Sequence, residues 1–74
     1  MKGSKSRIIT YMKLHGGITS QEAFREFGIT RLSARIKELR DMGYNISTIM
    51  VDGKNRYEEP VRYGLYRLED NNGN

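Results

Sequence analysis

The sequence predicts a single small α+β domain, mainly α-helical, in which three helices precede a two-stranded β-hairpin. Up to Gly43 the apolar residues recur every three or four positions, which is the spacing of one face of a helix. After Gly43 they follow the alternation and the β-branched enrichment of strands. With 74 residues, 36% of them hydrophobic, the chain has enough material for one core. We therefore expect one domain over residues 1–74, ordered from about 4 to 68.

A first helix is predicted from about Ser4 to His15, because its apolar residues share one stripe. These residues are Ile8, Ile9, Met12 and Tyr11. Gly16 and Gly17 end the helix, since glycine readily takes the left-handed conformation that closes a last turn. Ile18 then forms either a very short strand or a side chain that fills the core.

A second helix is predicted from about Ser20 to Phe27, and Thr19 provides its start. Glu22 stands three residues after Thr19, which is the spacing of a reciprocal capping box. Gly28 ends the helix. The residues expected to face the core are Ala23, Phe24 and Phe27.

A third helix is predicted over about residues 31–42, with Thr30 as its N-cap. Its apolar residues recur at intervals of four and three, as one buried face requires. They are Leu32, Ile36 and Leu39. Gly43 provides the stop.

A β-hairpin accounts for the rest of the chain. Its strands are predicted over Tyr44 to Val51 and Val61 to Leu68, which are rich in β-branched and aromatic residues. The connecting stretch, DGKNRYEEP, begins with an Asp-Gly turn pair and ends with the only proline. We expect Tyr44 and one face of the hairpin to pack on the helices. The polar residues 69–74 are expected to form a flexible tail.

The composition favours an anionic partner and gives no support to catalysis. Thirteen Lys and Arg against nine Asp and Glu give a net charge of +4. With no cysteine and one histidine, His15, no metal site or catalytic dyad is expected. No nucleophile motif or phosphate-binding loop occurs, so we expect neither an enzyme nor a cofactor, and no small-molecule ligand is evident. No apolar run is long enough for a membrane span, and we expect a cytoplasmic protein.

The stretch ITSQEAFREFGITRLSARIKELRDMGYNI resembles the helix-turn-helix of small winged-helix DNA-binding proteins, particularly those encoded by phages and other mobile elements. Three features support the resemblance, which extends from about Ile8 to Leu68: a capped short helix, Phe-Gly-Ile-Thr at the turn, and an Arg-rich helix ending at Gly-Tyr. It implies a winged helix-turn-helix fold that binds double-stranded DNA, with helix 31–42 in the major groove. The hairpin loop, residues 52–60, would be a wing on the backbone or in the minor groove. The chain departs from the motif at Phe24, because a small residue usually stands four positions before the turn glycine.

Candidate base contacts lie on the face of the third helix opposite its buried stripe. The small Ala34 at the centre of this face would let the helix approach the groove floor. Arg31 and Arg35 are candidates for base edges, because a guanidinium can donate two parallel bonds to guanine. Arg40, further along, is either a phosphate clamp or a solvated charge. Three more residues are candidates for bases or phosphates: Thr30, Ser33 and Lys37.

Phosphate contacts are expected outside this helix as well. Ser20 and Gln21 begin the second helix, and helix N-termini commonly donate hydrogen bonds to phosphates. The wing adds three polar residues: Lys54, Asn55 and Arg56. The N-terminus has three basic residues, which form either a further contact or a solubilising segment: Lys2, Lys5 and Arg7.

Two hypotheses for the function follow. The first is sequence-specific binding of double-stranded DNA by a small transcriptional regulator or an excisionase-like architectural factor. One such domain covers a short site, so a homodimer or a cooperative array on DNA is expected. The second is a protein-interaction module, an adaptor or inhibitor that acts through the wing. Replacing Arg31 and Arg35 with alanine abolishes the activity only under the first hypothesis.

Overall fold

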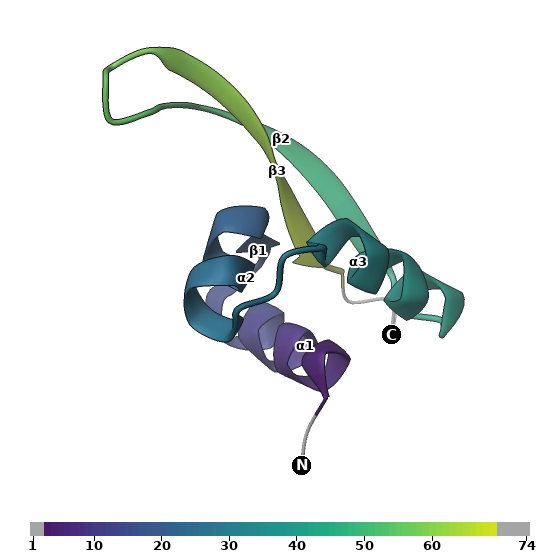
Figure 1. Ribbon diagram of the computed structural model, residues 1–74. Helices are drawn as coiled ribbons and strands as arrows, with labels where there is room; N and C mark the ends of the chain where they lie inside the picture. The colour runs from purple at the N-terminus through teal and green to yellow at the C-terminus, as the bar shows by residue number, and fades with distance from the viewer. Residues whose placement is uncertain (1–2, 70–74) are drawn as a thin grey trace.

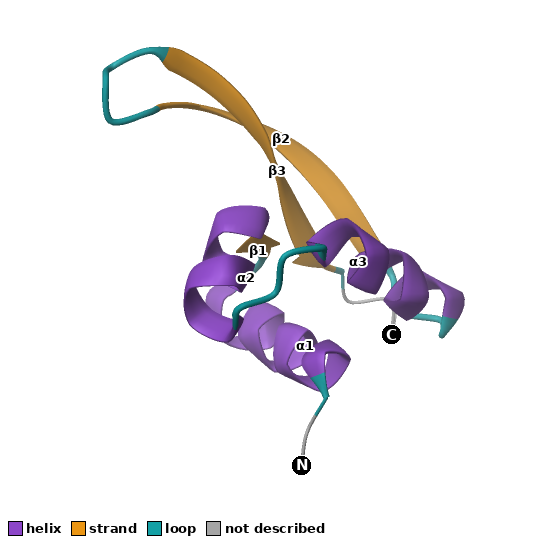
Figure 2. Ribbon diagram, viewed as in Figure 1, coloured by secondary structure: helices purple, strands orange, loops and turns teal. Residues whose placement is uncertain are grey.

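The helices and strands of the computed structural model, which describes residues 3–69, follow the predicted order (Figure 1). They are α1 Ser4–His15, β1 Ile18–Thr19, α2 Ser20–Phe27, α3 Leu32–Asp41, β2 Ile46–Lys54 and β3 Pro60–Leu68. The helices form one body, and the outer half of the β2–β3 hairpin projects well beyond it (Figure 2). Three helices followed by a hairpin therefore confirm the predicted fold class. Lys2 and the predicted tail from residue 70 on lie outside the described residues.

The core lies where the three helices meet the base of the hairpin. All four apolar residues predicted for the α1 stripe contribute to it, three of them fully and Tyr11 in part. The stripe predicted for α3 is also buried. The buried side chains are Ile8, Ile9, Met12, Ile18, Ala23, Leu32, Ile36, Leu39 and Ile46.

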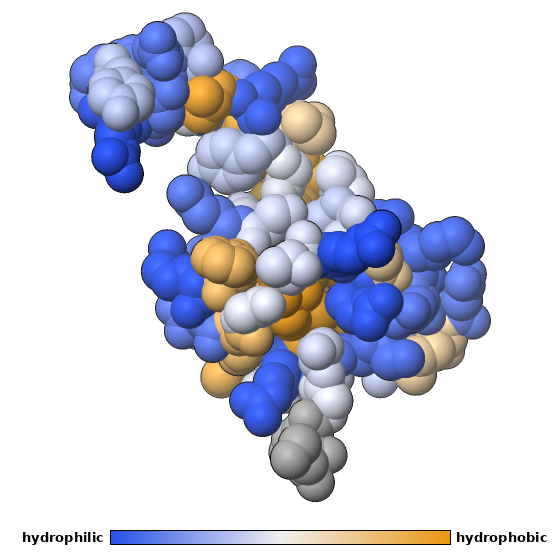
Figure 3. All heavy atoms as spheres, viewed as in Figure 1, coloured by the Kyte–Doolittle hydropathy of each residue, from blue (hydrophilic) through white to orange (hydrophobic). Residues whose placement is uncertain are grey.

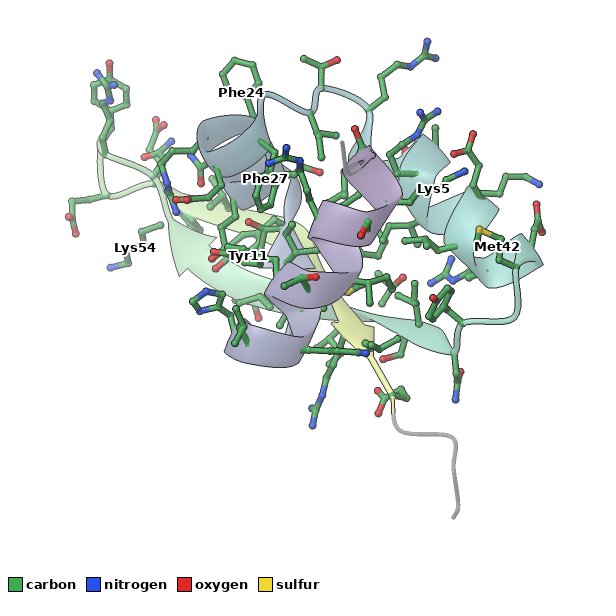
Figure 4. All side chains as sticks on the ribbon, turned by 90° about the horizontal axis from the view of Figure 1, so that it is seen from below. Lys5, Tyr11, Phe24, Phe27, Met42 and Lys54 are labelled. Atoms are coloured by element: carbon green, nitrogen blue, oxygen red, sulfur yellow. The ribbon has the colours of Figure 1, made fainter. Side chains whose placement is uncertain are left out.

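The prediction that Phe24 is buried was wrong. Ala23 is 0% exposed, whereas Phe24 is 60% exposed and points away from the helical body (Figure 4). The reason is the rotation of α2: with Ala23 at the close approach of the helices, the next residue turns about 100° toward solvent. The small residue of the motif therefore stands one position earlier than usual in this chain.

One aromatic contact joins α1 to α2. Phe27 is half-buried, and its ring meets the Tyr11 ring edge-on with 5.7 Å between their centroids. Partial burial and the nearby carboxylates of Glu22 and Glu26 raise the pKa of the Tyr11 phenol. The phenol therefore stays protonated across the neutral range, which suits a ring packed between two helices.

The hairpin belongs to a three-stranded sheet, because Ile18 forms a strand as well as filling the core. The strand order is β1-β3-β2, and Ile18 pairs with Tyr66. Gly17 precedes this strand, and a Cβ there would lie 2.9 Å from both a Leu65 side-chain carbon and the Tyr66 carbonyl oxygen. Only glycine fits so close to β3. The predicted two-stranded hairpin was therefore correct but incomplete.

The turn of the hairpin lies further along than predicted. Asp52 and Gly53 do not form it, because both are paired with β3 inside the ladder. Asn55 forms it instead: its side-chain Oδ1 accepts from the backbone N–H of Tyr57 at 2.8 Å and of Glu59 at 3.1 Å. An asparagine side chain that accepts hydrogen bonds from backbone N–H groups further along the chain takes the place of the strand-to-strand bonds, and this closes the loop. The Asp-Gly pair was the wrong signal because strand pairing outcompeted its turn propensity.

Two further expectations were wrong. Arg31, not Thr30, holds the N-cap position of α3, and no side chain caps that end. The helix begins at the first residue that enters the core, Leu32, so the cap falls one residue after Thr30. Tyr44 is exposed rather than packed on the helices, and the hairpin residues that belong to the core or contact it are Ile46, Tyr66 and Leu68. Only the base of the hairpin lies on the helical body, so its outer residues have nothing to pack against.

The predicted capping box at the start of α2 is present and gives a testable prediction. The Thr19 Oγ1 accepts from the Glu22 backbone N–H at 3.2 Å, and a Glu22 carboxylate oxygen accepts from the Thr19 N–H at 2.9 Å. Replacing Thr19 with alanine is expected to lower the free energy of unfolding by about 1 kcal/mol, measured by urea denaturation. Ser20→Ala is the control, because Ser20 is exposed and does not cap the helix. Equal stability of the two variants would contradict the role of the box.

Candidate nucleic-acid interface

The outer surface of α3 is polar and exposed along the face opposite its buried stripe. Ser33 and Lys37 are exposed, and Ala34 at the centre of the face is half-buried. In Figure 3 hydrophilic side chains cover most of α3, whereas hydrophobic ones gather over α2 and between the two helices. Lys37 forms an ion pair with Asp41 one turn later, with 3.6 Å between Nζ and Oδ2. The Ala34 side chain is shorter than the polar side chains of Ser33 and Lys37, so the middle of this face is recessed.

Arg35 does not project freely from α3, because Glu38 holds it. An Arg35 Nη2 lies 3.1 Å from one Glu38 carboxylate oxygen, and the Lys5 Nζ of α1 lies 3.7 Å from the other. Arg35 is half-buried, and its Nε has no hydrogen-bond partner among the residues described. The two cations therefore share one carboxylate at the α1–α3 contact. Within α3, Glu38 pairs with Arg35 three residues earlier.

Arg40 joins α3 to the sheet. Its Nε donates to the Ile46 carbonyl oxygen at 2.9 Å, and an Nη donates to the Thr48 hydroxyl at 3.0 Å. It is therefore more than the solvated charge that was one expectation for it. A guanidinium has five donors, so the remaining N–H groups stay available on the outer surface.

A shallow hollow of about 260 Å³ lies at the turn between α2 and α3. Thr30 and Arg31 line it on one side, Arg35 and the first residue of α1, Ser4, on another. Thr30 and Arg31 are both exposed. Among residues 3–69, no carboxylate lies within ion-pair distance of the Arg31 guanidinium, in contrast to Arg35 and Lys37. Arg31 is therefore the basic residue at the α3 start that is most accessible to an anion.

A larger groove, of about 930 Å³, separates the first turn of α2 from the hairpin. Ser20, Gln21 and Arg25 line its α2 side. Three candidate residues of the hairpin tip line the other: Lys54, Asn55 and Arg56. The fold thus brings the two predicted groups of phosphate contacts to opposite walls of one groove.

The family of the chain follows from comparison with known proteins. The family model for the winged helix-turn-helix domain matches residues 3–71, nearly the whole chain. This chain belongs to the winged helix-turn-helix family. No curated protein and no solved structure matches it significantly. Domains of this family typically bind DNA and are usually non-catalytic, with the second helix of the motif in the major groove.

In this winged helix-turn-helix domain α2 and α3 are the two helices of the motif, and the β2–β3 hairpin is the wing. Among the described residues, no group of three or more acidic, histidine or cysteine side chains could hold a metal ion. No helix in that part of the chain has the length and apolar character needed to cross a membrane.

The wing tip has no net charge. Three basic residues, Lys54, Arg56 and Arg62, are balanced by three acidic ones, Asp52, Glu58 and Glu59. Two of the cations are paired: Lys54 lies 3.9 Å from Glu58, and Arg62 lies 3.6 Å from Asp52. Arg56 instead lies over the Tyr57 ring, 5.9 Å from its centroid. Of the predicted wing cations, Arg56 is therefore the one best placed to contact a phosphate, and Asn55 is committed to the turn.

Sequence reasoning missed one residue of this surface. Arg25 lines the groove one helical turn after Gln21, and the interval of four residues was the signal that could have found it. Tyr57 also lines the groove and is 71% exposed. No local pattern distinguishes an exposed tyrosine at a loop tip from a tyrosine that packs on the core.

Proposed function

We propose that this winged helix-turn-helix domain binds double-stranded DNA sequence-specifically, with residues 31–42 in the major groove and the wing on the backbone or in the minor groove. It would act as a small transcriptional regulator or an excisionase-like architectural factor of the phage and mobile-element type. The observation that supports this most is the start of α3, where Arg31 is exposed with no carboxylate near it among the described residues. The proposed contacts are Thr30, Arg31, Ser33, Ala34, Arg35, Lys37, Arg40, Ser20, Gln21, Lys54, Asn55 and Arg56.

The proposed contacts fall into two groups, those to base edges and those to phosphates. Arg31 and Ser33 are assigned to base edges, since the first half of a recognition helix enters the groove most deeply. Ala34 provides the close approach, and Lys37 lies one turn from Ser33. Ser20 and Gln21 are assigned to phosphates at the start of α2. Phosphate contacts fix the position of the domain, and base contacts give the specificity.

The organisation around the DNA follows from the size of the domain. We infer that residues 1–74 form one domain, that two or more copies bind together on repeated half-sites, and that the protein works in the cytoplasm where its DNA target lies. The proposed activity is binding alone, with neither a cofactor nor a covalent step.

The test is fluorescence anisotropy on duplex DNA from just upstream of the protein's own gene, with a scrambled duplex beside it, over a series of salt concentrations. Preferential binding to the upstream duplex is expected, with a logarithmic salt slope of about 0.9 per phosphate contact. Equal, weak binding to both duplexes that disappears near physiological salt would reject specific recognition.

A second candidate function is a protein-interaction module that acts through the wing. The neutral, internally paired tip and the exposed Tyr57 favour it, because a wing built only for phosphates would have an excess of cations. Tyr57→Ala then abolishes partner binding while Arg31→Ala leaves it unchanged. Under the DNA proposal Arg31→Ala weakens binding to DNA, and Tyr57→Ala leaves it unchanged.

The Glu38 carboxylate gives a further prediction. Glu38→Gln is expected to strengthen DNA binding, because it removes a negative charge from α3 and releases Lys5 and Arg35. Exposed pairs are weak, so the gain is at most about 1 kcal/mol, roughly five-fold in Kd. Glu69→Gln is the charge-matched control at the far end of β3. Anisotropy that shows the same gain for both variants would mean that net charge alone, and not Glu38, sets the affinity.

A further inference from the structure

One edge of the β2 backbone pairs with β3, and the other edge has no neighbouring strand among the described residues. The two ends of the hairpin establish which residues face which side: the Glu69 N–H donates to the Asn45 carbonyl at 2.8 Å, and the Asn55 N–H donates to the Glu59 carbonyl at 3.0 Å. Antiparallel pairs alternate between bonded and non-bonded. The odd-numbered residues of β2 therefore bond to β3, and the even-numbered ones direct their N–H and C=O groups to the free edge.

Arg40 covers only the beginning of this free edge. Its guanidinium Nε donates a hydrogen bond to the Ile46 carbonyl oxygen at 2.9 Å. Beyond that point Thr48, Met50 and Asp52 turn their backbone groups outward, and β3 is the only sheet neighbour of β2 among the described residues. Figure 1 shows this part of β2 beyond the helical body. It is a run of bare peptide groups of the kind that accepts another strand.

The other edge of the hairpin is protected in ways that β2 is not. β1 covers the base of β3, where Ile18 pairs with Tyr66. Further out this edge ends at Pro60, which has no N–H to donate. A covering element and a proline are among the usual protections of an edge strand. Met50, at the middle of the bare β2 edge, is instead apolar and 51% exposed.

We propose that the β2 edge pairs with the β2 edge of a second copy of this chain, antiparallel, with the two-fold axis at Met50. This register uses the whole bare run symmetrically: Met50 faces Met50, and each Thr48 faces Asp52 of the second copy. A hydroxyl opposite a carboxylate can donate to it. Moving the axis to Val51 would place the two Asp52 carboxylates diagonally across the seam, where like charges repel.

The same register joins apolar side chains on the opposite face of the sheet. Ile49 faces Val51 of the second copy at a non-hydrogen-bonded pair, where side chains approach most closely. Ile49 is exposed in the single chain and Val51 is half-buried. One pairing therefore gives partners to both the free peptide groups and the exposed apolar side chains of β2. The β2 edge is thus complementary to the same edge of a second copy.

The pairing itself does not depend on DNA binding, but its consequence rests on the proposed function. A two-fold axis between antiparallel strands is perpendicular to the sheet, so both helical bodies lie on the same face. Four residues of strand separate Met50 from Ile46, so the two Ile46 positions lie roughly 26 Å apart at about 3.3 Å per residue. Arg40, near the end of α3, donates hydrogen bonds to Ile46 and Thr48, so each α3 helix lies close to its Ile46. Their separation is thus on the order of one turn of DNA, about 34 Å, which is the spacing of two half-sites.

The first test is sedimentation equilibrium of the purified full chain without DNA. A concentration-dependent dimer is expected, and Met50→Lys is expected to abolish it by placing two ammonium groups opposite each other. The lysine stays solvated in the single chain, so circular dichroism should be unchanged. Leu14→Lys, an equally charged change at an exposed apolar residue of α1, should leave the dimer intact. A monomer at every concentration, or a dimer unaffected by Met50→Lys, overturns the proposal.

A cross-linking test fixes the register, because the natural chain has no cysteine. Cα atoms of a hydrogen-bonded antiparallel pair lie about 5.5 Å apart, within the range of a disulfide. Met50→Cys should therefore form a covalent dimer on mild oxidation, whereas Thr48→Cys and Leu14→Cys should not. Equal cross-linking of all three variants overturns the register. A monomer that binds the upstream duplex specifically would reject this pairing alone, and a dimer without DNA affinity would reject the DNA proposal alone.

Discussion

Replacing Ile18 with alanine is expected to lower the free energy of unfolding by about 2 to 5 kcal/mol. Ile18 is 0% exposed and is held in β1, where it pairs with Tyr66 and packs into the centre of the core. The truncation leaves a cavity at the point where helices and sheet meet, and a domain of this size has only about 4 to 11 kcal/mol in total. Urea denaturation followed by circular dichroism should show a large fall in the midpoint.

Phe24→Ala is the matched control for this prediction. It removes a larger side chain, but that side chain is mostly exposed. Its effect on stability is therefore expected to stay within about 0.5 kcal/mol. A loss at Phe24 as large as that at Ile18 would show that the Phe24 ring is buried in solution and that the assignment of Ala23 to the close helix approach is wrong.

The helix positions were predictable because each depends on a local signal that the fold does not override. The stripes of α1 and α3 and the capping box at Thr19 depend on residues within one or two turns. The failure at the hairpin turn depends on a distant partner. Asp52 and Gly53 have turn propensity, but pairing with Arg62 and Val61 keeps them in the ladder. Local propensity cannot show that competition, since the energy comes from the other strand.

In the candidate site, too, the features that depend on nearby residues were predictable and those that depend on distant residues were not. Exposure of Arg31, Ser33 and Lys37 followed from the helical period and is observed. The attachment of Arg40 to the base of β2 was not predictable, because its two acceptors lie after the next glycine, in another element. The sharing of Glu38 by two cations was half predictable: the partner on α3 lies three residues away, while the partner on α1 is far away in sequence.

Arg31→Ala is expected to weaken binding to the upstream duplex by about 1 to 3 kcal/mol, roughly 5- to 150-fold in Kd. The guanidinium is exposed at the start of α3. It forms no ion pair with a carboxylate among the described residues, so no such pair has to break before it binds a guanine. Arg35→Ala should cost less affinity, because Arg35 is half-buried and must first separate from Glu38. Arg67→Ala, the same loss of charge on the exposed part of β3, is the control. Anisotropy with upstream and scrambled duplexes measures all three.

Arg31→Lys separates base recognition from charge. The lysine keeps the positive charge, so the salt slope and the affinity for the scrambled duplex should not change. It lacks the planar fork that donates two parallel bonds, so the preference for the upstream duplex should fall nearly as far as in Arg31→Ala. Retention of the full preference by the lysine variant would make Arg31 a phosphate contact. Base recognition would then pass to Ser33 and Lys37, the exposed residues on the middle of α3.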